Sequence, residues 1–280
     1  LESHRSLVFL LKPGKYSKNK MSVLGFVIIV LLLILVIFAD LYVGYDKVLA
    51  QDVKNKLQSP SLSHICGTDN LGRDLFARLI YGARVSLGIG VAATFAGMMI
   101  GCILGAACAY IGGIFDNAVM RILDVLYCVP FVLQAMLIVA ILGSSIPNLI
   151  FAVTVGNIPG YAKVTRGAVI SVTERDYVKA AKVSGVSTGN IILKYIIPNA
   201  AGVLITNGAF YLADTLLASS GLSFLGIGVQ PPVPEWGSIL SSGLEYMNSG
   251  PHIVILSGLF IAVTTVGITL IGDGLRDVFE

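Results

Sequence analysis

Charged side chains are scarce in this chain of 280 residues: Asp, Glu, Lys and Arg make up 12% of it, whereas hydrophobic residues make up 55%. A water-soluble protein carries about 25% charged residues, so too few are present here to cover an ordinary globular surface. The formal net charge of +3 is small and dispersed, unlike the basic patch of a nucleic-acid-binding protein. We therefore predict an integral membrane protein that contacts lipid and binds no nucleic acid.

Cysteine and histidine are also rare. The four cysteines show no CxxC spacing, and the three histidines have no cysteine or carboxylate near them at metal-ligand spacing. A free cysteine in an apolar helix behaves as a small hydrophobic residue, and a structural zinc site needs about four closely spaced ligands. The phosphate-binding pattern GxxxxGK(S/T) is absent as well. We predict no disulfide, no metal site and no cofactor in this chain.

Long apolar runs are abundant, and the mean hydropathy is +0.85. A helix of roughly 20 residues crosses a bilayer core about 30 Å thick. Six segments are candidates for such helices: 22–41, 85–110, 118–142, 147–164, 200–224 and 252–271. The fourth is short and is interrupted by Asn157, Pro159 and Gly160. We predict an all-α membrane protein with six transmembrane helices.

Basic residues orient these helices. Five of them precede the first span: Arg5, Lys12, Lys15, Lys18 and Lys20. Because the apolar run is long and no small-x-small cleavage site follows it, we interpret 22–41 as a retained anchor rather than a cleaved signal. With the basic segment 1–21 in the cytoplasm, six spans return both termini to that side of the cell membrane.

The remaining segments follow from this topology. Segment 42–84 lies outside, although it carries six basic residues. Segment 85–280 forms a core of five spans, with an inner loop at 165–199. Its outer loop at 226–250 has no Lys or Arg, as expected outside the cell.

Glycines recur every four residues in the second span. Gly97, Gly101 and Gly105 share one helix face with Ala93, so another backbone can approach closely. Such a face packs either inside the chain's own bundle or against a second subunit. We favour the first, because small faces of this kind are common within helix bundles.

Five polar residues lie inside the predicted spans: Asp124, Gln134, Asn157, Asn207 and Asp214. A charged side chain at the bilayer centre costs about 2.5–3.5 kcal/mol on insertion scales, so these residues must face protein or water. Asp124 follows Arg121 by one helical turn, and we interpret them as an intrahelical ion pair. Asp214, with Asn207, is the first candidate to line a water-filled path, and hydrogen bonding to a neighbouring helix is the alternative.

A pattern typical of serine hydrolases, GxSxG, occurs at 185–189 around Ser187. That pattern needs a preceding strand, a following helix and a histidine within reach, whereas both flanks here are predicted helical. We interpret Gly185 as the C-terminal cap of one helix and Ser187 as the N-cap of the next. The chain is therefore predicted not to be an enzyme.

Segment 174–198 places two charged helices between two predicted spans. With Ala180-Ala181, Gly185 and Ile197-Pro198 at their spacing, it resembles the EAA signature of binding-protein-dependent ABC importer permeases. Further motifs follow the order seen in the second permease subunit of dipeptide, oligopeptide and nickel importers: His64, Gly67-Thr68-Asp69, Gly72-Arg73-Asp74, Tyr81-Gly82-Ala83-Arg84, Gly112-Gly113, Ser223-Phe224-Leu225-Gly226, Gln230-Pro231-Pro232, Glu235-Trp236-Gly237 and Gly272-Asp273-Gly274-Leu275-Arg276-Asp277. Together these motifs are specific, although each alone is weak.

The resemblance implies the type I ABC importer permease fold, with a coupling helix at roughly 173–184 that docks on an ATPase subunit. The docking residues it implies are Glu174, Asp176, Tyr177, Lys179, Ala180, Ala181, Ser184 and Gly185. Tyr177 and three small residues recur at three- and four-residue spacing, which gives a face that fits a groove closely. Lys179 stands where the signature has Glu, which reverses a charge at the implied interface.

The resemblance also implies partners: a second permease chain, two ATPase subunits that bind ATP and Mg, and an extracytoplasmic substrate-binding protein. The outer loop looks like a cap over the pathway, with Gln230, Pro231, Pro232 and Trp236, and we expect the tryptophan at the membrane interface. Residues 67–83 resemble the family's stretch beside the outer face. There we expect Asp69 or Asp74 to cap a short amphipathic helix containing Phe76, Leu79 and Ile80.

Ser219 completes the pathway candidates Asp214, Asn207 and Asp124, because it lies where many peptide permeases have an acidic residue. Di- or oligopeptides are the first choice of cargo, and nickel or a metal chelate is the alternative. A stand-alone secondary transporter or channel is a hypothesis of a different class. It predicts inverted repeats with paired broken helices, whereas one interrupted span is visible.

Overall fold

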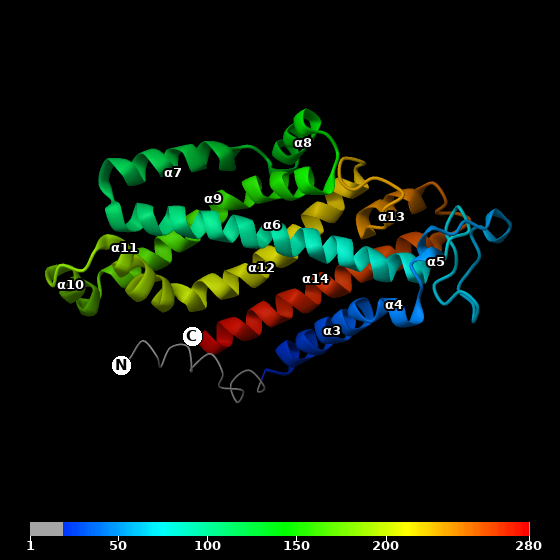
Figure 1. Cartoon of the computed structure of the whole chain (residues 1–280), viewed down its shortest axis with the longest axis horizontal. Coiled ribbons are helices and arrows are strands. Elements are labelled where there is room, and N and C mark those ends of the chain that lie inside the picture. Colours follow the sequence, from blue (N-terminus) through cyan, green and yellow to red (C-terminus); the bar gives the residue numbers. More distant parts are fainter. Residues whose placement is uncertain (1–18, 280) are drawn as a thin grey trace.

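The computed structural model describes residues 19–279, all of whose regular elements are helical (Figure 1). The basic residues Arg5, Lys12, Lys15 and Lys18 lie outside this range. In chain order the elements are α3 (Lys20–Ile37), α4 (Ala39–Tyr42), α5 (Asp46–Leu49), the 3-10 turn η1 (Val53–Asn55), α6 (Leu75–Ile111), α7 (Gly113–Cys128), α8 (Phe131–Leu142), α9 (Ile146–Thr173), α10 (Asp176–Val183), α11 (Thr188–Ile191), the π-helix η2 (Ile192–Ile196), α12 (Ile197–Phe224), α13 (Trp236–Leu244) and α14 (Pro251–Phe279).

Four helical runs in the described range are long and apolar enough to cross a membrane: α3, α6, the continuous run Thr188–Phe224, and α14. The bent pair α7 and α8 counts as a fifth if it is one broken span. The all-α membrane fold is thus confirmed, whereas the count of six spans is not.

The predicted third span, 118–142, is not a single helix. It is divided between α7 and α8, whose axes are bent by 89°. The break falls at Val129, with ψ 125°, and Pro130. Proline lacks an N–H and pushes the residue before it out of the α region, so the helix ends there.

The predicted fourth span, 147–164, lies within α9, but the interruption expected there is absent, because α9 runs unbroken for 28 residues. Asn157, Pro159 and Gly160 are all buried inside it and do not interrupt it. The helix also continues beyond the predicted end at Val164, through Lys163 and Arg166, into a polar last section.

The second span begins ten residues before the predicted start. Asp74 is its N-cap, and the carboxylate accepts a hydrogen bond from the Ala77 N–H at 2.9 Å. The expected short amphipathic helix with Phe76 and Leu79 therefore forms the first turns of α6. Asp74, and not Asp69, provides the cap.

The glycine face of α6 packs against α9 inside the same chain. A Cβ on Gly101 would lie 2.5 Å from the Tyr161 Cβ, and one on Gly97 would lie 3.2 Å from the Asn157 Cβ. No side chain therefore fits at Gly101 unless α9 moves. The prediction that this face is buried in the chain's own bundle is confirmed.

The first and last described helices lie together at one edge of the bundle (Figure 1). α3 packs on α14, where a Cβ on Gly25 would lie 2.6 Å from the Gly267 carbonyl oxygen. At their ends the Asn19 amide donates a hydrogen bond to the Asp277 carboxylate at 2.6 Å.

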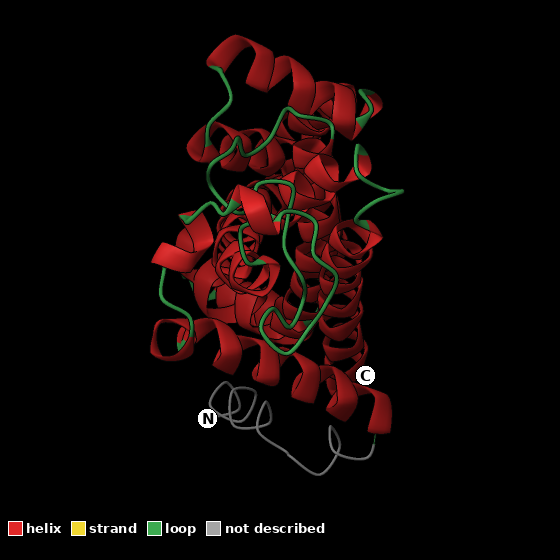
Figure 2. Ribbon diagram, turned by 90° about the vertical axis from the view of Figure 1, so that its right-hand side faces the viewer, coloured by secondary structure: helices red, strands yellow, loops and turns green. Residues whose placement is uncertain are grey.

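The irregular segments divide between the two ends of the bundle. α10 and α11 lie at one end, whereas α13 and the long segment before α6 lie at the other (Figure 1). Figure 2 looks onto this second end, where several loops run across the ends of the helices.

Candidate functional site

α10 is a helix of eight residues that is attached to the bundle by one face. Asp176 in the first turn and Lys182 in the last suit the helix dipole. Gly185 ends the segment with φ +78°, a left-handed conformation that glycine adopts without strain, as the sequence predicted.

The inward face of α10 carries Val178 and Ala181, of which 2% and 7% are exposed. Both belong to a cluster with Ala106 of α6, Val169 of α9 and Ile191 of α11. Ala181, predicted to share the docking face, is thus turned toward the bundle. This apolar cluster joins α10 mechanically to two long helices.

The outward face carries Tyr177, 43% exposed, together with Ala180 and Ser184. Lys179 is also exposed, with its ammonium 3.9 Å from the Asp176 carboxylate. Glu174 lies between α9 and α10, where it is the C-cap residue of α9. The outward face thus presents one aromatic side chain beside small residues.

A π-helix that no sequence pattern predicted follows α11. Ile192–Ile196 forms this turn directly before α12. Pro198, near the start of α12, has no N–H to donate to the Lys194 carbonyl, so regular α-helical bonding is interrupted. At the next carbonyl, that of Tyr195, the Asn199 side chain donates a hydrogen bond at 2.5 Å. The predicted helix that begins after Ser187 therefore continues into α12.

At the opposite end, Glu235 is the N-cap of α13 and anchors the outer loop. Its carboxylate accepts hydrogen bonds from the N–H groups of Gly237 (3.0 Å) and Ser238 (2.9 Å). It also accepts one from the Ser86 hydroxyl of α6 at 3.1 Å. Burial raises the pKa of Glu235, and the two backbone hydrogen bonds partly offset this.

Trp236 is completely buried, which corrects the expectation that it lies at the membrane interface. Its indole N–H donates to the Leu79 carbonyl at 2.8 Å, and its ring meets Phe260 edge-on at 5.9 Å. Gln230, Pro231 and Pro232 are exposed on the loop before it. The outer loop is thus held to α6 and α14 while its proline-rich part remains accessible.

We predict that Glu235→Ala destabilises the protein by about 2 kcal/mol, because three donors, two of them buried, lose their acceptor. Thermal unfolding in detergent measures this. Glu235→Gln keeps one acceptor without a buried charge, so its thermal stability stays close to that of the wild type at neutral pH.

Stability should also depend on pH through Glu235. Because the folded pKa is raised, the contribution of Glu235 to stability is greatest below its ordinary pKa of 4.5 and is lost as pH rises through the folded pKa. Glu235→Gln should lack this dependence, and identical profiles of thermal stability against pH for the wild type and Glu235→Gln would contradict the prediction.

The segment before α6 is predicted to lie outside the cell although it is rich in Lys and Arg, and ion pairs neutralise part of this positive charge. The Asp69 carboxylate lies 2.7 Å from Arg73 Nε and 3.4 Å from Arg78 Nε, and all three side chains are buried. Arg84 reaches Asp40 at 3.0 Å. Three of the six basic residues are therefore paired with carboxylates.

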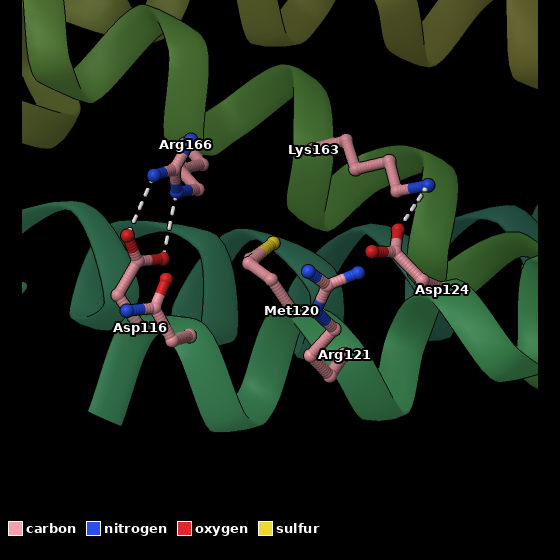
Figure 3. A pocket seen from close by; sticks show the side chains of 7 residues that line it. Asp116, Met120, Arg121, Asp124, Lys163 and Arg166 are labelled. Carbon is pink, nitrogen blue, oxygen red and sulfur yellow. Dashed lines mark hydrogen bonds and ion pairs between the residues drawn. The ribbon is translucent and has the colours of Figure 1, made fainter. Parts of the chain in front are cut away.

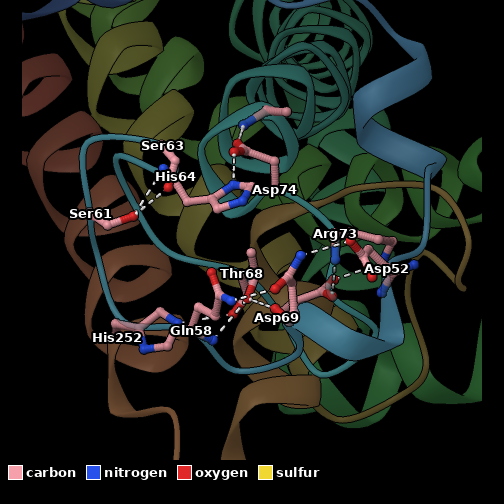
Figure 4. Close-up of polar contacts among 12 residues, drawn as sticks. Asp52, Gln58, Ser61, Ser63, His64, Thr68, Asp69, Arg73, Asp74 and His252 are labelled. Atoms are coloured by element: carbon pink, nitrogen blue, oxygen red, sulfur yellow. Dashed lines mark hydrogen bonds and ion pairs between the residues drawn. The ribbon is translucent and has the colours of Figure 1, made fainter.

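Two histidines brace the same segment (Figure 4). His64 Nδ1 lies 2.9 Å from Asp74, and His252 Nε2 lies 3.0 Å from the Thr68 carbonyl. Cys66, two residues after His64, is buried, and this burial raises the pKa of its thiol to about 11. These contacts fold the loop onto the ends of α6 and α14.

Some polar residues of the predicted spans make buried hydrogen bonds, whereas others are exposed. Asn157 donates to the Thr215 hydroxyl at 2.8 Å, which joins α9 to α12. Ser219 is buried and its hydroxyl donates to the Leu216 carbonyl, so it lines no open surface of this chain. Asp214 is exposed on α12. Asn207, half-buried on the same helix, donates to its own backbone at Val203.

Asp124 pairs with Lys163 of α9 at 2.8 Å, rather than with Arg121 as predicted. A second ion pair, missed by the sequence analysis, joins Asp116 of α7 to Arg166 of α9. Arg166 donates two hydrogen bonds to that carboxylate, at 2.7 and 2.6 Å. These residues surround a pocket of about 360 Å³ between α7 and α9, which Asn117, Met120 and Arg121 also line (Figure 3).

Comparisons with known proteins fit this arrangement. Residues 97–280 match the family described as binding-protein-dependent transport system inner membrane component. Residues 15–60 match the N-terminal TM domain of oligopeptide transport permease C.

Curated relatives align over almost the whole chain. A dipeptide transport system permease protein of Alkalihalophilus pseudofirmus is 37% identical over 263 residues, which cover 94% of this chain and 86% of the relative. A glutathione transport system permease protein of Escherichia coli is 36% identical over 266 residues, which cover 95% and 88%.

Among solved structures, the inward-facing MetNI methionine ABC transporter shares the fold, with a TM-score of 0.58 at 21% identity. The match covers 71% of this chain and 95% of that one. Fold, family profile and full-length relatives agree: the chain belongs to the binding-protein-dependent transport system inner membrane components, the permease subunits of ABC importers.

Proposed function

We propose that this chain is one of two permease subunits of an ATP-driven importer for di- or oligopeptides. The observation that carries the proposal is the opposite placement of two accessible elements, α10 at one end of the bundle and the outer loop with α13 at the other. An importer needs both surfaces, one for the ATPase and one for the binding protein. The cargo follows from the relatives, a dipeptide permease and a glutathione permease. Neither relative is named for nickel transport, so the nickel alternative has less support.

The coupling step runs through α10. Its outward face, with Tyr177 and Ala180, docks on an ATPase subunit. When the ATPase subunits bind ATP and Mg and close, they move α10. Because Val178 and Ala181 pack against α6, α9 and α11, that movement passes into the long helices. The chain itself has no catalytic role, and hydrolysis belongs to the ATPase subunits.

The outer loop, with exposed Gln230, Pro231 and Pro232, receives the substrate-binding protein. Asp214, Asn207 and Asp124 line the pathway that opens between this chain and the second permease. In this orientation the basic N-terminal segment and the end of α14 lie in the cytoplasm, in agreement with the excess of Lys and Arg on the α10 side.

Purification of this chain from native membranes tests the assembly. We expect two ATPase subunits and a second permease to copurify, and the reconstituted complex to take up peptides only with ATP and an external binding protein. Uptake by the chain alone in liposomes would contradict the proposal and favour a secondary transporter or channel. Uptake of nickel without peptides would contradict the cargo only.

A further inference from the structure

The pocket between α7 and α9 holds a surplus of positive charge. Its lining contains the carboxylates of Asp116 and Asp124 and the basic groups of Arg121, Lys163 and Arg166. Both carboxylates are engaged in the ion pairs described above. Arg121 lies between the two pairs in Figure 3 and makes no ion pair or hydrogen bond within residues 19–279. The Arg121 guanidinium therefore contributes only its charge to the nearby Asp124 carboxylate, and its N–H donors are left for an anion.

The pocket lies toward the end of the bundle that carries α10. Asp116 is in the first turn of α7, and Arg166 lies seven residues before the end of α9, about 10 Å along the helix. A volume of about 360 Å³ lies at the small end of the range for ligand sites. Such a pocket accommodates a carboxylate with the residue that bears it.

The acyl chains of a lipid find little surface inside this pocket, because Met120 is its only apolar lining residue. On α7, Ile122 is 64% exposed on the side opposite the pocket, whereas Val125, 69% exposed, follows Arg121 by one turn. Helical geometry turns Ile122 away from Asp116 and Met120. The polar lining suits a water-soluble anion, and the crosslinking experiment below distinguishes it from a phospholipid headgroup.

Polar and aromatic groups continue from the pocket toward α12. Lys163 lies 4.3 Å above the ring of Tyr127. The ring of Tyr211 on α12 lies against that of Tyr161 on α9, with ring centroids 4.2 Å apart. Asp214 follows Tyr211 by about one turn and is exposed. A charged side chain on a membrane-spanning helix faces protein or water rather than lipid.

We propose that this pocket receives the C-terminal carboxylate of the transported peptide, with Arg121 as its partner and Asp214 as a counter-charge for the peptide ammonium. Guanidinium binds carboxylate through two parallel N–H···O hydrogen bonds, which gives both strength and orientation. Tyr127 and Tyr211 provide surfaces for the peptide between the two charges. The inference rests on the proposed peptide cargo and adds to it a binding site for the free C-terminus.

Photocrosslinking in the complete importer tests occupancy. Benzoylphenylalanine replaces Met120 in the pocket or, as the matched control, Ile122 on the opposite side of α7. The complex is irradiated during uptake of a pool of synthetic di- and tripeptides, and adducts are identified by mass spectrometry. We expect peptide adducts at position 120 and none at 122. Phospholipid adducts at 120, or equal peptide labelling at both positions, would overturn the assignment.

Uptake measurements test the role of the charge. Arg121→Gln should lower both peptide uptake and crosslinking at position 120 about tenfold, the effect of losing one charge-assisted hydrogen-bonded contact. Arg121→Lys should recover part of both, whereas Lys20→Gln, which removes an exposed cation at the start of α3, should change neither. Unaltered crosslinking in Arg121→Gln would refute the role of Arg121. If wild-type importer takes up no peptide from the pool, the proposed cargo fails instead.

Discussion

Gly101→Leu is expected to abolish the folded permease. A Cβ at this position already lies 2.5 Å from the Tyr161 Cβ, and 2.9 Å from the Ile158 carbonyl oxygen. The leucine side chain has to push α6 and α9 apart along their whole shared face. Overpacking of a tight core costs about 3 kcal/mol or more. Size-exclusion profiles and thermal unfolding in detergent measure the loss.

Gly88→Leu is the matched control in the same helix, since nothing lies within 4 Å of a Cβ there. We expect this variant to purify and unfold like the wild type. If both variants behaved alike, close contact between α6 and α9 would not be what stabilises the bundle.

Ala180→Trp is expected to uncouple ATP hydrolysis from uptake without unfolding the chain. Ala180 is on the exposed face of α10, where a large side chain obstructs docking on the ATPase but meets no neighbour within this chain. A docking loss of about 1.4 kcal/mol lowers the docking equilibrium constant tenfold, and a loss of about 3 kcal/mol lowers it more than a hundredfold, so uptake should fall about tenfold or more. Uptake and binding-protein-stimulated ATPase activity are measured on the reconstituted complex.

Two variants separate docking from folding. Ala180→Ser keeps a small side chain and should transport normally. Ala181→Trp, one residue further on, points into the cluster around Val178 and should reduce thermal stability instead. Normal coupling in Ala180→Trp would show that this face does not meet the ATPase.

Local signals in the sequence predicted the helical fold and several of its details correctly. Glycine spacing identified the buried face of α6, because small residues at every fourth position have few other uses in a membrane helix. Gly185 and Ser187 marked the turn between α10 and α11. These features depend on residues close together in the chain, and so the sequence is sufficient for them.

Features that depend on distant partners were predicted wrongly. Asp124 has Arg121 one turn away, yet it pairs with Lys163, which the packing of α9 brings alongside. Trp236 carries the composition signal of an interfacial residue, but the Leu79 carbonyl and Phe260 bury it. Pro130 and Pro159 are identical in type, and only their surroundings decide that the first breaks a helix while the second is accommodated.

The pairing of α3 with α14 has a consequence for biosynthesis. α3 leaves the ribosome before the other described helices, whereas its main neighbour leaves last, after more than 200 intervening residues. The early helix must therefore reside in the bilayer without that neighbour while the rest of the chain is translated. Its composition suits this interval, because nearly every side chain on every face of α3 is apolar and tolerates lipid.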